Sequence, residues 1–278
     1  MQKTLLIVSG GIEAVDAARR AKEMGLYVVV SDRDPEAPGF ALADSCIIAD
    51  VYSPQETLAA ARRYAMKLRK IDGVICMAAD APLTSATVAE QLRLPGISTE
   101  SAKLACDKLA MKERFLAAGV PVPWFSPVAT PQALQRMAVE RGQDLVIKPV
   151  DSRGSRGVQR VSAAADLAKA FQLARQHSPT ERVMAEEYLS GPQVSTESVI
   201  VGGVCHTPGF SDRNYEYLER YAPYFIENGG DLPSRLPAET QQKVKDVVAK
   251  AAAALGITHG TVKGDIVVHD GEPYVIEL

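Results

Sequence analysis

Short apolar runs alternate with amphipathic segments along the first 95 residues of the chain. Continuous apolar runs are typical of strands that are buried on both faces, whereas apolar positions about three to four residues apart are typical of helices. This alternation predicts a parallel sheet covered on both faces, which is a Rossmann-like first domain over residues 1–95. The predicted strands are Thr4–Ser9, Tyr27–Ser31, Cys46–Ala49 and Gly73–Met77, and the predicted helices are Glu13–Met24, Pro54–Lys70 and Leu83–Gln91.

From residue 96 the pattern becomes a mixture of helices and strands without regular alternation, which predicts an α+β arrangement. Residues 207–235 are rich in aromatic and charged side chains and are predicted to be irregular. The fold class is therefore α/β followed by α+β. The predicted helices are about 100–118, Pro131–Arg141, about 164–177 and Ala238–Leu255, and the predicted strands are Asp144–Lys148, Val158–Val161, Arg182–Glu187, Gln193–Val201, Thr261–Val268 and Glu272–Leu278.

Composition narrows the class of protein without identifying it. The 278 residues are 46% hydrophobic and 23% charged, with a net charge of -3, so no general affinity for nucleic acid or anionic membranes is indicated. The opening apolar run ends at Gly10-Gly11 and is too short for a signal-peptide core, and no apolar stretch approaches membrane-spanning length. The four cysteines form no CxxC pair and indicate reduced thiols. We therefore expect a cytoplasmic protein.

The turn Ser9-Gly10-Gly11, with Asp32 after the second strand, is reminiscent of a dinucleotide site. The third small residue of the GxGxxG spacing is absent, because Ala14 is out of register, so we do not predict dinucleotide binding. The other interpretation is a tight turn between strand and helix, whose helix N-terminus can still face an anionic group.

Two lysines and a loop are candidates for binding phosphate. Lys148 ends an apolar strand and is followed by the glycine- and arginine-rich loop 151–157, whose backbone N–H groups can cover phosphate oxygens. Lys108 lies on an earlier helix. A lysine before such a loop is more often part of a solvated hairpin, and an isolated Lys108 is more often a surface residue. The loop is not a Walker A motif, because no GK[ST] follows it.

The stretch Met184–Leu189 is a strand that runs into a loop and carries two adjacent glutamates. Backbone groups around Glu187–Leu189 can hydrogen-bond the edge of a purine while Leu189 packs on its face. The alternative is an edge strand with a solvated glutamate pair.

Asp265 and Glu277 lie on the two strands of the last predicted hairpin, and their midpoint is residue 271. A three-residue loop centred on Gly271 would place them directly opposite each other, with Cβ atoms about 4.5–5.5 Å apart. Two carboxylates this close on apolar strands are costly without a cation between them, and oxygen ligands suit Mg²⁺. We favour a metal. The alternative is neutralisation by Lys263 or an arginine.

In order and spacing, several stretches together resemble the ATP-grasp superfamily, and in particular the branch of biotin carboxylase, carbamoyl-phosphate synthetase and carboxylate–amine ligases. No single stretch is diagnostic, but their order along the whole chain is. These stretches are Gly10-Gly11, Ser31-Asp32-Arg33-Asp34-Pro35, Ala79-Asp80-Ala81 through Leu94-Pro95-Gly96, Asp107-Lys108-Leu109-Ala110-Met111-Lys112 and Gly119-Val120-Pro121-Val122-Pro123. The resemblance implies a pre-ATP-grasp domain over 1–95 and a two-lobed ATP-grasp domain over 96–278, with a small lid subdomain at about 123–187.

The resemblance implies that ATP and Mg²⁺ (or Mn²⁺) are the cofactors. Lys108 and Lys148 resemble the lysines that contact the α- and β-phosphates, and Gln193 stands where many relatives use Glu for the ribose hydroxyls. Asp265 and Glu277 resemble the two metal-bridging carboxylates. By the same resemblance, the flexible loop over the triphosphate corresponds to Ser152, Arg153, Gly154, Ser155, Arg156 and Gly157, and the adenine hinge corresponds to Glu186, Glu187, Tyr188 and Leu189.

The implied reaction activates a carboxylate as an acyl phosphate and transfers it to an amine or similar nucleophile. Lys263 is a candidate for contacting substrate near the metal, and Arg213, in the 207–235 segment that we expect to border the acceptor pocket, is a candidate for pairing with a substrate carboxylate. The partners expected are small-molecule substrates, and a homodimer is compatible with the resemblance. Two alternatives stay open, a bicarbonate-activating carboxylase or carbamoyl-phosphate-synthetase-like enzyme, and a non-catalytic ATP-binding regulatory fragment.

Relatives continue past the second carboxylate with an Asn or small residue and then an Arg, whereas this chain ends at Leu278, one residue beyond Glu277. The expectation is that the C-terminal end of the ATP-grasp domain is incomplete in this sequence.

Overall fold

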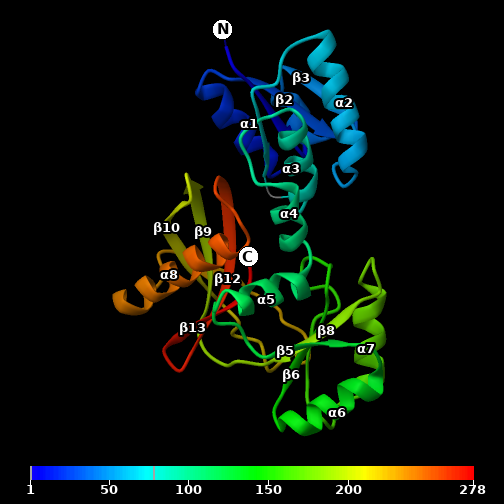
Figure 1. Cartoon of the computed structure of the whole chain (residues 1–278), viewed down its shortest axis with the longest axis vertical. Coiled ribbons are helices and arrows are strands. Elements are labelled where there is room, and N and C mark those ends of the chain that lie inside the picture. The colour runs from blue at the N-terminus through cyan, green and yellow to red at the C-terminus, as the bar shows by residue number, and fades with distance from the viewer. Residues whose placement is uncertain (1, 78) are drawn as a thin grey trace. The chain divides into compact units, whose positions relative to one another are not determined.

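The computed structural model describes residues 2–77 and 79–278. The chain divides into two compact units, Met1–Lys103 and Leu104–Leu278. Figure 1 shows the elements of each unit along the chain. The predicted domain boundaries, with a division after residue 95, stay a prediction.

The first unit is built on a four-stranded parallel sheet with the order β3-β2-β1-β4. Its strands are β1 (Thr4–Val8), β2 (Tyr27–Asp32), β3 (Ser45–Ile48) and β4 (Gly73–Cys76), and its helices are α1 (Ala14–Glu23), the 3-10 turn η1 (Pro38–Leu42), α2 (Pro54–Lys67) and α3 (Pro82–Gln91). Side chains that alternate along a strand point to opposite faces, and β1 shows this directly. Ile7 joins the core formed with α1, whereas Leu6 and Val8 join the core formed with α2 and α3. The predicted parallel sheet with two covered faces is confirmed.

The glycine turn after β1 forms a hydrogen bond with a side chain of the same unit. The backbone N–H of Gly10 donates to Oδ2 of Asp32 at 2.8 Å. The anionic group at this turn is therefore a side chain of the same unit, placed there by β2.

The second unit contains two antiparallel sheets, with the strand orders β5-β8-β6-β7 and β11-β10-β9-β12-β13. Helices α6 and α7 pack against the first sheet, which we call the lid sheet, and α8 packs against the second (Figure 1). The elements up to the lid sheet are α4 (Thr99–Ala105, at the division between units), α5 (Lys108–Ala117), β5 (Phe125–Val128), α6 (Pro131–Arg141), β6 (Leu145–Pro149), β7 (Gln159–Val161), α7 (Leu167–Gln176) and β8 (Val183–Glu187). The remaining elements are β9 (Gln193–Val201), β10 (Val204–Arg213), β11 (Gly230–Asp231), α8 (Ala238–Ala254), β12 (Gly260–His269) and β13 (Glu272–Glu277).

The single helix predicted over about 100–118 is wrong. The chain forms α4 and α5 with a break between them, because Asp107 adopts an extended conformation. Its side chain accepts hydrogen bonds from the backbone of Leu109 and Ala110, which is the usual N-cap arrangement. The break starts α5 at Lys108, whose side chain therefore leaves the first turn of a helix.

The irregular segment predicted over 207–235 is wrong at both ends. Strand β10 extends to Arg213 and pairs with β9, and the short β11 pairs back onto it. The register of β10 against β9 shifts by one residue between His206 and Gly209, and Pro208 lies inside this bulge. A proline inside a run of strand-forming residues argues against a regular strand, so the sequence pattern did not predict β10.

The last hairpin reaches the predicted pairing by a different route. Asp265 lies opposite Glu277, as predicted. The loop, however, is the two-residue turn Asp270-Gly271, since His269 pairs with Glu272. Both turn residues have positive φ, 50° and 81°, as a tight hairpin turn of this hand requires. A bulge between Asp265 and Ile266 then shifts the register by one residue and restores the pairing.

Candidate functional site

A single pocket of the second unit is lined by nearly all of the residues that the sequence singled out. Lys263 and Gly157 are not part of its wall. Apart from Leu189, the sequence did not single out the pocket's apolar residues, of which Phe225 is the largest. The predicted residues that line it are Lys108, Lys148, Ser152, Arg153, Gly154, Ser155, Arg156, Glu186, Glu187, Tyr188, Leu189, Gln193, Arg213, Asp265 and Glu277.

Strand alternation explains how Lys148 and Glu186 reach this pocket. In β6 and β8 the residues Ile147 and Ala185 belong to the core under α6 and α7, so their neighbours Lys148 and Glu186 point to the other face of the lid sheet. Strand β8 lies between β5 and β6, and Val146 pairs directly with Glu186. The alternative of a solvated glutamate pair on an edge strand is therefore wrong for Glu186.

Glu186 is a buried carboxylate that contacts two buried lysines. One carboxylate oxygen accepts a hydrogen bond from Lys148, and the other lies 2.9 Å from Nζ of Lys112, outside the angles of a directed hydrogen bond. The exposed fractions of the three side chains are 3% for Glu186, 5% for Lys148 and 0% for Lys112. Burial opposes ionisation of Glu186, but the charges of Lys112 and Lys148 outweigh it and hold the pKa of the carboxyl below its ordinary value.

Sequence reasoning gave Lys112 no role. Burial lowers the pKa of its ammonium, and the charge of Glu186 counteracts that effect. The available signal was its spacing from Lys108, because residues four positions apart lie on the same face of a helix. Leu109 and Phe115 of α5 are also buried, so the helix is embedded around this lysine.

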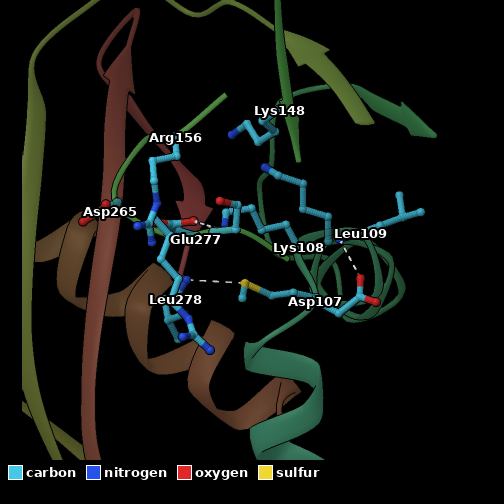
Figure 2. A network of polar contacts seen from close by, with 12 residues as sticks. Asp107, Lys108, Leu109, Lys148, Arg156, Asp265, Glu277 and Leu278 are labelled. Atoms are coloured by element: carbon cyan, nitrogen blue, oxygen red, sulfur yellow. Dashed lines mark hydrogen bonds and ion pairs between the residues drawn. The ribbon is translucent and has the colours of Figure 1, made fainter. Parts of the chain in front are cut away.

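Lys108 connects the start of α5 with the phosphate loop and the last hairpin. Its backbone N–H donates to the carbonyl of Val150 at 2.9 Å, and its Nζ donates to the carbonyl of Ser152 at 2.8 Å. The same Nζ lies 3.3 Å from Oε2 of Glu277. Figure 2 shows Lys108, Lys148 and Glu277 around one space, although they come from three elements.

The loop 152–157 is held in a conformation that favours glycine. Gly154, Ser155 and Gly157 have positive φ values of 61°, 54° and 76°. A side chain at Gly157 would also meet Pro149 Cγ at 3.0 Å and the backbone of Ala174 at 3.2 Å. The end of the loop is therefore fixed against α7, while its tip at Gly154 and Ser155 is exposed.

The predicted adenine hinge comprises the last two residues of β8 and the two residues after it, and its backbone donors are used unequally. Glu187 N–H donates to the carbonyl of Trp124 at 2.8 Å, and Tyr188 N–H donates to that of Asp144 at 3.0 Å. Leu189 N–H has no protein acceptor within residues 2–77 and 79–278, and this residue lines the pocket. One donor at the pocket wall is thus available to a ligand.

The 207–235 segment contacts the lid sheet through Arg160 of β7. Nη1 of Arg160 donates to Glu219 at 2.8 Å, and its backbone N–H donates to the carbonyl of Pro223 at the same distance. Its guanidinium also lies over the ring of Tyr188, which is 6.3 Å from that of Phe225. These contacts bring Phe225 to the pocket wall beside the hinge.

Protein cations lie against the two opposed carboxylates. Oδ1 of Asp265 accepts hydrogen bonds from Arg213 and Lys263, both at 2.7 Å, and Lys108 is close to Glu277. Neutralisation by Lys263 or an arginine, which was the alternative to a metal, is therefore present at Asp265. Burial opposes ionisation of Glu277, but the charges of Lys108 and Lys148 outweigh it and lower the pKa of this carboxyl.

The same two carboxylates still fit a small divalent cation. Oδ2 of Asp265 and Oε1 of Glu277 have no hydrogen-bond donor among the described residues, so each carboxylate keeps an oxygen for a ligand. Mg²⁺ typically takes one or two carboxylates together with phosphate oxygens and water. No group of three or more His, Cys, Asp or Glu side chains that could hold a metal occurs among the described residues. The donor set therefore fits a metal that shares its coordination with a phosphate ligand.

Arg213, predicted to pair with a substrate carboxylate, contacts two carboxylates of the chain. Nη2 donates to Asp265 and Nη1 donates to Glu227, both at 2.7 Å. Its buried Nε has no hydrogen-bond partner in the part of the chain that the structure describes. Burial opposes the charge of Arg213, but Asp265, Tyr215 and Glu227 together outweigh it, and the pKa of the guanidinium lies above its ordinary value.

Residues 105–278 match the family model described as an ATP-grasp domain. An L-amino acid ligase from Bacillus licheniformis has the same fold, with a TM-score of 0.81, 23% identity, and coverage of 99% of this chain and 66% of that one. A D-alanine–D-alanine ligase from Aromatoleum aromaticum is 30% identical over 68% of this chain and 61% of that protein. The uncharacterized protein y4rH of Sinorhizobium fredii is 27% identical over all of this chain and 58% of that protein.

The family match covers more than half of the chain, so the chain belongs to the ATP-grasp family. The predicted family and fold class are confirmed. The chain spans about three-fifths of the length of the two curated relatives, 58% and 61%. ATP-grasp ligases use ATP. No helix among the described residues is long and apolar enough to cross a membrane.

Proposed function

We propose that this chain binds ATP in the pocket of its second unit. The observation that carries the proposal is the convergence of four sequence features on one pocket: the two lysines, the glycine-rich loop, the stretch after β8 and the opposed carboxylates. Lys108 and Lys148 hold the phosphates, and the loop 152–157 covers them. Leu189 N–H hydrogen-bonds the edge of the adenine, while Tyr188 and Phe225 enclose it with apolar surface. Gln193 is the candidate for the ribose hydroxyls.

Asp265 and Glu277 would hold the Mg²⁺ or Mn²⁺ that accompanies the nucleotide. A bound divalent cation supplies positive charge at the phosphoryl oxygens and offsets the charge that develops there during transfer. Arg213 and Lys263 already bring positive charge to Asp265, and Lys108 brings it to Glu277. The protein's own cations thus reduce the repulsion between the two carboxylates.

The proposed reaction is the ATP-dependent joining of a carboxylate and an amine. A carboxylate oxygen of the substrate attacks the γ-phosphorus, the bond from the γ-phosphorus to the β-phosphate oxygen breaks, and ADP and an acyl phosphate result. The amine then attacks the acyl carbon, loses a proton and displaces phosphate. Lys108 and Lys148 orient the phosphates for the first step, and electrostatic positioning supplies the catalysis. Lys263 and Arg213 are the candidates for contacting substrate near Asp265.

The names of one curated relative and one structural neighbour support amino acids as the substrates to test first. The names of the D-alanine–D-alanine ligase and of the L-amino acid ligase both specify amino acids, which carry a carboxylate and an amine. Because those proteins are longer than this chain, substrate choice is part of the proposal.

The test measures ATP binding by titration calorimetry and then ADP and phosphate release over a panel of D- and L-amino acids, other carboxylic acids and bicarbonate. We expect ATP to bind in the micromolar range or tighter, and an amino acid to stimulate ADP release. The variant Lys108→Met/Lys148→Met should lose ATP binding, while Lys169→Met, an exposed lysine on α7, serves as the matched control.

Three results would change this conclusion. Failure of the native chain to bind ATP would refute it. Turnover with bicarbonate but with no amino acid would point to a carboxylase or carbamoyl-phosphate-synthetase-like activity. ATP binding without turnover on any substrate would favour a non-catalytic nucleotide-binding role for this stretch of sequence.

A further inference from the structure

Lys112 is a fully buried lysine for which the proposed reaction has no task. Its side chain extends from α5 into the space between the lid sheet and the last hairpin, and its exposed fraction is 0%. Nζ lies 2.9 Å from Oε2 of Glu186 and donates to the carbonyl of Val275 at 3.4 Å. A charged lysine is expensive to bury, so a position like this one requires an explanation beyond packing.

Glu186 divides its two oxygens between two ammonium groups. Lys148 hydrogen-bonds Oε1, and Lys112 lies against Oε2. Two lysines and one carboxylate leave this trio with one positive charge in excess. Opposite charges attract strongly where water is excluded, and this attraction to Glu186 counteracts the burial that lowers the pKa of Lys112. The charges of the trio are also screened less than they would be at the surface.

The excess charge lies beside the pocket. Lys148 and Glu186 both line it, whereas Lys112 does not. If Glu186 had Lys148 as its single partner, the pair would be neutral and a phosphate would have to compete with a full carboxylate charge for Lys148. With Lys112 on the second oxygen, part of the negative charge of Glu186 is already neutralised.

Lys112 also connects the elements that carry the two halves of the site. It extends from α5, four residues after Lys108, and contacts β8 through Glu186. Its bond to the carbonyl of Val275 reaches β13, two residues before Glu277. One buried ammonium group is thus in contact with the lid sheet and with the strand that carries a candidate metal ligand.

We propose that Lys112 is a positioning residue, which shares Glu186 with Lys148 and thereby leaves Lys148 with the positive charge that attracts a nucleotide polyphosphate. This inference rests on the proposed ATP binding and names a residue outside the pocket wall as a determinant of its selectivity for phosphate. Lys112 does not touch the nucleotide, and its effect passes through Glu186 to Lys148.

The inference makes a prediction that a purely structural ion pair does not make. If Lys112 served stability alone, its removal would weaken the binding of all nucleosides and nucleotides by the same factor. If it adjusts the charge of Lys148, its removal weakens the binding of each ligand in proportion to the number of phosphates that the ligand carries. The measurement is therefore the ratio of ATP affinity to adenosine affinity, obtained by calorimetry on folded protein.

We expect Lys112→Met to lower this ratio about tenfold, which corresponds to about 1.4 kcal/mol, because Glu186 then opposes the phosphates at Lys148 with its full negative charge. The double variant Lys112→Met/Glu186→Gln restores the net charge of the trio, so its ratio should return to within about threefold of the native value. Lys112→Arg keeps the positive charge, so its ratio should also lie within about threefold of the native value. Lys169→Met, on the surface of α7, should leave the ratio unchanged.

A ratio that is equal in the native chain, Lys112→Met and the double variant would refute the inference, even though ATP still binds. Failure of the native chain to bind ATP would instead refute the proposed function. If Lys112→Met gives no folded protein, Lys112→Gln provides the same comparison, because it removes the positive charge beside Glu186 while keeping a polar side chain there. Its ratio must then be lower than that of the native chain, and an equal or higher ratio would overturn the inference.

Discussion

The two charged corners of the pocket are built in opposite ways. At the lid sheet, Glu186 is 3% exposed and contacts Lys112 and Lys148, which are equally buried. At the last hairpin, Asp265 is 19% exposed and Glu277 38% exposed. The first corner has a positive charge in excess and little access to water. The second presents two carboxylates, each with an oxygen that has no hydrogen-bond donor among the described residues.

This difference matches what each corner would have to do. A buried and fixed cation is preorganised for an anion, because its position does not change when the ligand arrives. A partly exposed carboxylate pair suits a cation that enters with its own water and phosphate ligands. The buried corner should therefore control stability and phosphate selectivity, whereas the exposed corner should control the response to metal.

The largest expected effect comes from removing the central charge of the buried corner. Glu186→Ala leaves Lys112 and Lys148 buried without a carboxylate, and breaking buried ion pairs in this way costs about 3–5 kcal/mol of unfolding free energy. The adjacent Glu187→Ala is the matched control, since Glu187 is partly exposed and pairs with Arg141 at 2.9 Å. It should cost about 1 kcal/mol or less.

Urea unfolding followed by circular dichroism measures both values. Similar losses for the two glutamates would show that burial of the trio contributes little to stability, and the contrast between the corners would then fail.

Substitutions at the exposed corner should change metal binding more than the free energy of unfolding. Asp265→Asn together with Glu277→Gln removes both candidate ligand charges, and we expect Mg²⁺ to stop strengthening ATP binding and Mg²⁺-ATP turnover to be lost. The loss of metal-dependent affinity should reach about a hundredfold, which is about 2.7 kcal/mol. Calorimetry with ATP in Mg²⁺ and in EDTA measures it, and Mn²⁺ relaxation in the presence of ADP gives a readout independent of activity.

The control for loss of negative charge on the same hairpin is Asp270→Asn, on its exposed turn. It should keep the full response to Mg²⁺. Unchanged metal dependence in Asp265→Asn/Glu277→Gln would show that the two carboxylates serve only as partners of Arg213, Lys263 and Lys108.

The sequence predicted the fold where its patterns are local. The alternation of β1 specified a sheet with two covered faces, and the apolar run before Lys148 placed that lysine at the end of a strand. The opposition of Asp265 and Glu277 was also predicted, although through a three-residue loop. The actual two-residue turn is compensated by a bulge at Ile266. A bulge has no clear sequence signature, so the prediction was right in outcome and wrong in route.

The sequence failed where long-range contacts decide. The pattern of α4 and α5 reads as one helix, because helical periodicity continues across Asp107 and its capping role depends on the conformation of the backbone. Lys112 looks like an ordinary helix lysine until β8 brings Glu186 to it from 74 positions further along the chain. Pairing between segments this far apart leaves no periodic trace in either one.

The response of stability to acid separates the corners further. The pKa of Glu186 is lowered in the folded state, so its ionised form contributes stability that is fully present above its ordinary value of 4.5 and is lost as the pH falls through the lower folded value. This effect is smaller than that of Glu186→Ala, because protonation keeps the side chain in place. Native protein should lose more unfolding free energy than Lys112→Met/Glu186→Gln as the pH falls below 4.5 through the lower folded pKa of Glu186.

Denaturant titrations at several pH values test this difference. Other carboxyls with lowered pKa whose partners are unchanged, such as Asp44 and Asp72, are present in both proteins and cancel in the comparison. Parallel curves for the two proteins would show that the charge of Glu186 contributes no net stability.

The smallest effect concerns the cations that already occupy the exposed corner. Arg213 donates to Asp265 at 2.7 Å, so it competes with a metal for that carboxylate. Arg213→Gln should therefore strengthen Mn²⁺ binding in the absence of nucleotide by about fivefold at most, because partly exposed ion pairs contribute about 1 kcal/mol or less. Arg220→Gln is the control, since Arg220 is exposed and its guanidinium lies over the ring of Tyr221. Mn²⁺ relaxation titrations distinguish the two, and weaker Mn²⁺ binding in Arg213→Gln would mean that this arginine organises Asp265 for the metal instead of competing with it.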